Sequence, residues 1–181
     1  MKFEDILGNG TLWATVYDEG QGNILNNVFG QWTDIDYLEG FFANNIADLQ
    51  TYFNITDLDL AIYDTITDAM AMKCMILDLK EDVPLDYYFR PLENFRTNEM
   101  ILSREKAKGV AHTNHPSWLR LYALKFDNNT YLITGGAIKL THTMAEREHT
   151  LKELHTLEKV RSYLIENGVS DIDGLKELAS I

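Results

Sequence analysis

The sequence predicts an α+β fold, in which helices pack on a small antiparallel sheet and a long helix lies near the C-terminus. Three observations favour this class. Apolar residues step by three and four between residues 33 and 77, two apolar segments resembling a β-hairpin lie between residues 118 and 140, and apolar residues recur at helical spacing from 151 to 164. With 181 residues, 45% of them hydrophobic, the chain can close one core, so we expect residues 1–181 to form a single domain.

The first half of the chain predicts a strand followed by two helices. Apolar residues alternate over residues 12–17, which is typical of a strand. A helix is expected from Thr33 to about residue 53, with an acidic first turn and an apolar stripe. Thr56 is expected to cap a second helix, whose stripe includes Met70 and a buried Cys74. Both helices are expected to cover one face of the sheet.

The second half predicts a hairpin between two helical regions. Residues 98–108 have the composition of a short basic helix that ends at Gly109. Strands at 119–126 and 130–140 are expected to pair through an Asn-containing turn, with a bulge or close backbone approach at Gly135-Gly136.

Helix signals return after the hairpin. Thr143 and Glu146 have the spacing of a capping box, and the apolar repeat that follows runs to Asn167-Gly168, a helix stop. A short helix is expected after Ser170. These signals predict the long C-terminal helix and its short successor.

Composition excludes several classes of protein. The single Cys rules out a disulfide framework and a cysteine-based zinc site, and the one Glu-x-x-His step at Glu146–His149 falls short of a di-iron set. We therefore expect no metal and no cofactor. No leader peptide and no apolar run of membrane-spanning length is present, so a cytoplasmic protein without a membrane partner is expected.

Charge is distributed unevenly along the chain. The net charge is −12, and residues 1–89 contain 3 Lys and 16 acidic residues, whereas residues 90–181 contain 13 basic and 12 acidic residues. An acidic face formed by the first helices and a separate basic face are therefore expected. A basic face can follow a phosphate backbone if it points away from the acidic half. The alternative is an ordinary solvated surface.

The predicted hairpin brings candidate catalytic residues together. Arg120 lies on its first strand and Lys139 near the end of its second, so the two side chains are expected to meet at one end of the sheet, with His142 just beyond. Arg, Lys and His can hold a phosphodiester, neutralise developing charge and transfer a proton. Ordinary strand-end charges are the alternative explanation.

The hairpin block, Leu119 to Phe126 and then Tyr131 to Thr143 followed by a long helix, resembles the RelE/ParE-like toxin superfamily, in its phage-derived, HigB-like branch. There an Arg-aromatic strand pairs with a strand that ends in Lys and Thr. Ile138-Lys139 stands where the family carries a Lys-Lys pair. The resemblance implies a toxin of a toxin–antitoxin system, with ribosome-dependent mRNA cleavage or gyrase inhibition as its activity, and an antitoxin protein and the ribosome or mRNA as partners.

Two functions therefore remain open. In the first, an endoribonuclease, Arg120 binds phosphate, Lys139 stabilises the oxyanion and His142 transfers a proton. RNA-backbone contacts are then expected from four further cations, Arg104, Lys106, Lys108 and Lys125. In the second, a non-catalytic interaction module, the acidic helices bind a host protein or mimic nucleic acid, as in a phage or mobile-element protein.

Overall fold

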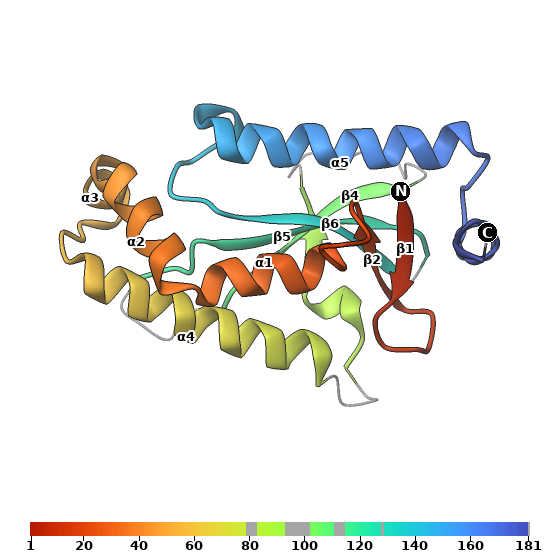
Figure 1. Ribbon diagram of the computed structural model, residues 1–181, viewed down its shortest axis with the longest axis horizontal. Coiled ribbons are helices and arrows are strands. Elements are labelled where there is room, and N and C mark those ends of the chain that lie inside the picture. Colours follow the sequence, from red (N-terminus) through yellow and green to blue (C-terminus); the bar gives the residue numbers. More distant parts are fainter. Residues whose placement is uncertain (79–82, 93–101, 111–114, 128, 181) are drawn as a thin grey trace.

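A six-stranded sheet forms the centre of the protein (Figure 1). The computed structural model describes residues 1–78, 83–92, 102–110, 115–127 and 129–180. The strands follow the order β1-β2-β6-β5-β4-β3 across the sheet. Their bounds are β1 (Lys2–Asp5), β2 (Leu12–Val16), β3 (Phe89–Pro91), β4 (Ser103–Lys108), β5 (Leu119–Lys125) and β6 (Tyr131–Ile138).

The α+β class is confirmed, but the sheet is mixed rather than wholly antiparallel. β2 pairs in parallel with β6, while the other four neighbouring pairs are antiparallel. The described part of the connection from β2 to β6 includes four α-helices and three strands, and this connection is long enough to bring the second strand back in the same direction. The pattern of residues 12–17 indicates a strand without indicating its partner, so the parallel pair was not predictable from it.

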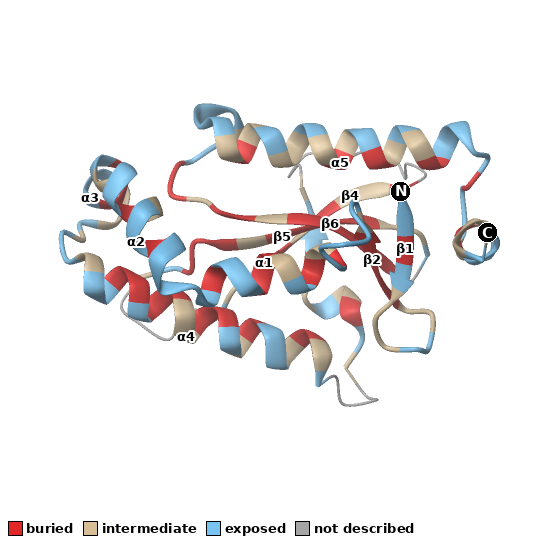
Figure 2. Ribbon diagram, viewed as in Figure 1, coloured by how far each residue is buried: buried red, intermediate tan, exposed pale blue. Residues whose placement is uncertain are grey.

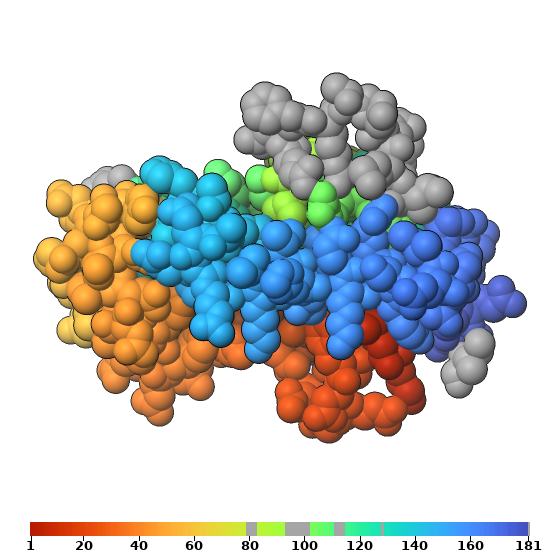
Figure 3. All heavy atoms as spheres, turned by 90° about the horizontal axis from the view of Figure 1, so that it is seen from above, coloured from red at the N-terminus to blue at the C-terminus, as the bar shows by residue number. Residues whose placement is uncertain are grey.

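Helices cover both faces of this sheet (Figure 1). α1 (Ile24–Thr33), α2 (Ile35–Asn44), α3 (Ile46–Phe53) and α4 (Leu58–Leu77) share one hydrophobic core with one face. α5 (Glu148–Glu166) covers the other face through a second core, and α6 (Ile172–Ala179) contacts β1. Viewed from the α5 side, α5 runs along much of the length of the molecule (Figure 3). Short 3-10 turns occur at Leu85–Tyr87 and Met144–Glu146.

The helical region differs in detail from the prediction. The single helix expected from Thr33 is divided into α2 and α3, and α1 precedes it unpredicted. Asp57, rather than Thr56, accepts the capping hydrogen bond of α4. The buried face of α4 is also rotated: Cys74 and Met70 are exposed. Figure 2 shows the buried residues of α4 facing the sheet and α1.

Residues 103–108 form a strand, so the basic helix expected at 98–108 is wrong for this part; residues 98–101 lie outside the described residues. The basic side chains of β4, at 104, 106 and 108, alternate with Glu105 and Ala107, which are both buried. This period of two is typical of a strand, and pairing with β5 on one side and β3 on the other stabilises it.

The predicted hairpin is confirmed. β5 and β6 pair antiparallel, and Asn129 has a φ of 63° at the turn. The register shifts between Tyr122 and Ala123, where Thr134 is the extra residue of a bulge. At Gly135 the close neighbour is a side chain rather than backbone, because an added Cβ atom would lie 1.9 Å from Oε2 of Glu153.

Candidate anion-binding site

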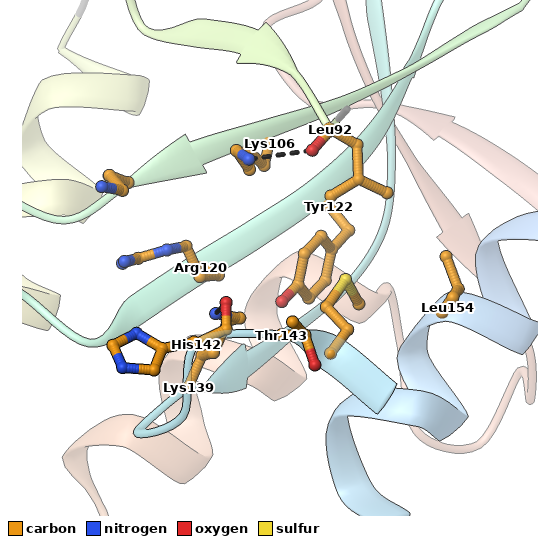
Figure 4. A pocket seen from close by; sticks show the side chains of 10 residues that line it. Leu92, Lys106, Arg120, Tyr122, Lys139, His142, Thr143 and Leu154 are labelled. Atoms are coloured by element: carbon orange, nitrogen blue, oxygen red, sulfur yellow. Dashed lines mark hydrogen bonds between the residues drawn. The ribbon is translucent and has the colours of Figure 1, made fainter. Parts of the chain in front are cut away.

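A pocket of about 420 Å³ lies over β4 and β5, beside the start of α5 (Figure 4). Its lining contains five groups that are cationic or can become so: Lys106, Lys108, Arg120, Lys139 and His142. The remaining described lining residues are Leu92, Tyr122, Thr143, Met144 and Leu154. All three residues predicted to be catalytic therefore line one pocket, together with two of the predicted RNA-backbone contacts.

Sheet register explains why three of these cations converge. Lys108 lies opposite Arg120, and Lys106 lies opposite Tyr122, on neighbouring antiparallel strands. Side chains directly opposite each other point to the same face of a sheet. Arg120 is fixed further, because its Nη1 donates to the carbonyl oxygens of Ser117 at 2.8 Å and Leu119 at 2.7 Å. Nζ of Lys106 donates to the carbonyl oxygen of Leu92 at 2.9 Å.

The connection between β6 and α5 supplies the other two basic residues of the pocket, Lys139 and His142. Nζ of Lys139 donates to the carbonyl oxygens of Thr141 and His142, both at 2.6 Å. The predicted capping box of Thr143 and Glu146 is present, but it caps the 3-10 turn Met144–Glu146 rather than α5, whose N-cap Arg147 makes no side-chain capping hydrogen bond. The box fixes the end of this connection. The ring of His142 meets the ring of Tyr52 edge to face, with centroids 4.9 Å apart. A folded loop, rather than the strand itself, thus places Lys139 and His142.

Electrostatics favour an anion in this pocket. Burial lowers the pKa of Lys139, and Arg120 and Lys106 lower it further by repulsion. Burial, Arg120 and Lys108 likewise lower the pKa of Lys106. Among the described lining residues none is Asp or Glu. A bound anion would relieve this repulsion.

The other two predicted RNA contacts lie outside the pocket. Arg104 pairs with Glu158 of α5, with Nη1 and Oε1 2.5 Å apart. Lys125 is at the opposite end of β5 from Leu119, and its Nζ lies 2.8 Å from Oδ1 of Asp86. Both cations are thus engaged by carboxylates of the fold. Composition alone did not distinguish them from the pocket cations.

Tyr122 is a pocket residue that the sequence analysis did not single out. Only 1% of it is exposed, and its hydroxyl makes no hydrogen bond with any described residue. In Figure 4 the hydroxyl points toward Arg120, Lys139 and Thr143. The spacing Arg120-x-Tyr122 places the two side chains on one face of β5, and this was the available signal.

Neither a metal cluster nor a relative identifies the site. Within the described residues no group of three or more His, Cys, Asp or Glu is placed to hold a metal ion. None of the described helices is long and apolar enough to cross a membrane. No family model matches the sequence, and neither curated proteins nor solved structures give a significant match.

Proposed function

We propose that this protein is an endoribonuclease of the toxin type, which binds a phosphodiester of RNA in the basic pocket. One observation carries this proposal: in a chain of net charge −12, five basic side chains from β4, β5 and the β6–α5 connection line a single pocket. The resemblance of the hairpin to RelE/ParE-like toxins supports the same activity. On this proposal an antitoxin and ribosome-bound mRNA are the partners.

RNA provides its own nucleophile for the reaction. The 2′-oxygen attacks the adjacent phosphorus, and His142 accepts the 2′ proton. The bond from phosphorus to the 5′-oxygen breaks, and Lys139, whose pKa is lowered, gives that oxygen a proton. The products are a 2′,3′-cyclic phosphate and a 5′-hydroxyl. Arg120 and Lys106 stabilise the additional negative charge on the phosphoryl oxygens in the transition state.

The test compares variants whose side chains differ in structural role. His142 and Lys108 are exposed, so His142→Ala and Lys108→Ala are expected to change stability by roughly half a kcal/mol or less. His142→Ala should lower RNA cleavage by about a hundredfold or more, since general acid–base catalysis contributes about 10²–10⁴. Lys108→Ala should weaken RNA binding while leaving the rate at saturation nearly unchanged.

Wild-type protein is assayed for growth inhibition on expression and for cleavage of ribosome-bound mRNA. Lys139→Ala is the less informative variant, because it also removes two hydrogen bonds within the β6–α5 connection. A wild-type protein that is harmless and leaves the mRNA intact would contradict the proposal.

An acidic interaction module is the second candidate, and one observation favours it. Between Lys2 and Lys73 the sequence contains no Lys or Arg, and Asp36, Glu39 and Asp59 are exposed on α2 and α4. Asp64 and Asp68, in contrast, are only 2% and 1% exposed, so they cannot contact a partner. Charge reversal at Asp36 and Asp59 therefore tests this function: it should abolish capture of a basic partner by a wild-type protein that does not itself cleave RNA.

A further inference from the structure

The pocket has a cationic part and an apolar part (Figure 4). Arg120, Lys139 and His142 lie together, whereas Leu92 and Leu154 lie on the other side of Tyr122. Met144 adds a flexible apolar side chain to the lining. A phosphate occupies only the cationic part. The volume of about 420 Å³ falls within the range of about 300–1,000 Å³ that is typical of small-molecule sites.

The Tyr122 hydroxyl lies where the two parts meet. It is buried and has no hydrogen-bond partner among the described residues. A buried polar group without a partner is unfavourable, and such groups in native proteins commonly meet a ligand or water. Its neighbours in the pocket are cations, apolar side chains and Thr143, whose side chain already accepts a hydrogen bond in the capping box. The missing partner is therefore an acceptor or hydroxyl that arrives with the bound molecule.

We propose that the pocket recognises a whole ribonucleotide unit rather than phosphate alone. The phosphate contacts Arg120 and Lys139, the ribose 2′-hydroxyl bonds to the hydroxyl of Tyr122, and the base packs on Leu92, Met144 and Leu154. This inference rests on the proposed function for its phosphate anchor. A phosphorylated peptide offers the same anion, but phosphoserine carries no hydroxyl next to its phosphate to meet Tyr122.

Binding is measured by calorimetry with four probes: inorganic phosphate, adenosine 3′-monophosphate, its 2′-deoxy analogue and a phosphoserine peptide. Adenosine 3′-monophosphate should bind roughly tenfold tighter than inorganic phosphate, because the base buries apolar area. The deoxy analogue should bind roughly fivefold more weakly than the ribonucleotide, the effect of one lost hydrogen bond.

Two variants assign the effects to residues. Tyr122→Phe should weaken binding of the ribonucleotide roughly fivefold. The affinities for the deoxy analogue and for inorganic phosphate should not change. Tyr122→Phe should not lower the thermal midpoint, because the hydroxyl that it removes has no partner in the fold. Met144→Ala should weaken binding of both nucleotides but not binding of inorganic phosphate. Met144→Leu should restore the affinity for both nucleotides.

The outcomes separate this inference from the proposed function. Ribonucleotide recognition would be overturned if inorganic phosphate and the ribonucleotide bound with equal affinity. It would also be overturned if Tyr122→Phe lowered the affinities for the ribonucleotide and its deoxy analogue equally. Either result would leave phosphate binding intact. Tighter binding of the phosphoserine peptide would overturn ribonucleotide recognition as well. Failure of all four probes to bind would instead remove the phosphate anchor and, with it, the proposed function.

Discussion

Glu153 shows how one side chain adapts to a crowded position between α5 and the sheet. Its carboxyl group accepts a hydrogen bond from the backbone N–H of Gly136, and the absence of a side chain at Gly135 leaves room for it. Burial nevertheless raises the pKa of Glu153 to about 7. Near neutral pH the folded protein therefore holds a carboxyl that resists ionisation, next to a bulge in its central strand.

A pH-dependent stability follows from this raised pKa. The unfolded chain releases the Glu153 proton near its ordinary pKa, whereas the folded protein keeps it until about pH 7. Its contribution to stability is thus complete below about pH 4.5 and is lost as the pH rises to about 7. Glu153→Gln keeps the acceptor but does not ionise, so above pH 7 it should be more stable than the wild type by about 2–3 kcal/mol.

Urea unfolding at several pH values measures this difference. The gap between Glu153→Gln and the wild type should be small at pH 4.5 and grow up to pH 7. Lys159→Gln, an exposed position further along α5 whose charge does not shift the pKa of Glu153, serves as the control and should show no such growth. A gap independent of pH would show that Glu153 ionises freely in the fold.

At the scale of elements, the turn before α5 determines the shape of the site. The capping box of Thr143 and Glu146 closes the connection that carries Lys139 and His142. Thr143→Ala removes a side-chain acceptor and should destabilise the protein by about 1 kcal/mol, as loss of a capping residue does. Because the His142 backbone then loosens, RNA cleavage should fall as well.

Thr143→Ser provides the matched comparison, since it keeps the hydroxyl and loses only a methyl group. Both stability and cleavage should return nearly to wild-type values in this variant, measured by urea unfolding and by initial rates. If Thr143→Ala kept full activity despite lower stability, the capping box would stabilise the 3-10 turn without positioning the site.

The elements that local pattern specifies were predictable from the sequence. The hairpin, its bulge and the capping box follow from short-range signals such as Asn129, Gly135 and the Thr143–Glu146 spacing. The break at Asn45 between α2 and α3 and the rotated buried face of α4 depend on tertiary packing, which local periodicity does not contain. For the same reason, β4 was read as a helix, although its pairing with β3 and β5 makes it a strand.

The candidate site was predictable in part. Arg120, Lys139 and His142 were found because a hairpin brings its two ends together. Arg104 and Lys125 looked equivalent in composition, but their carboxylate partners Glu158 and Asp86 lie 54 and 39 positions away along the chain. Such long-range pairs leave no local signal. Tyr122 was overlooked because a buried tyrosine in a strand has the same pattern as core.

At the scale of the whole molecule, the basic pocket and a group of exposed acids lie on different sides of the sheet. The basic pocket lies on the face covered by α5, while the exposed acids Asp36, Glu39 and Asp59 belong to helices of the other face. Net charge of −12 repels RNA at long range, although the pocket attracts a phosphate at short range. Overall charge should therefore affect the rate of association more than the rate of dissociation.

Neutralising the acidic face tests this separation of charge. In the triple variant Asp36→Asn, Glu39→Gln and Asp59→Asn, the association rate constant for a single-stranded RNA should rise roughly two- to threefold at about 0.01 M salt, where the Debye length is about 30 Å. At about 1 M salt, where the Debye length is about 3 Å, the triple variant and the wild type should associate with RNA equally fast.

The charge-conserving triple variant Asp36→Glu, Glu39→Asp and Asp59→Glu is the control. It should match the wild type at both salt concentrations in stopped-flow measurements. Dissociation should stay constant throughout, because the contacts that hold the phosphate are those of the pocket. Slower association after neutralisation would instead mean that the acidic helices themselves contact the RNA, which would contradict this separation of charge.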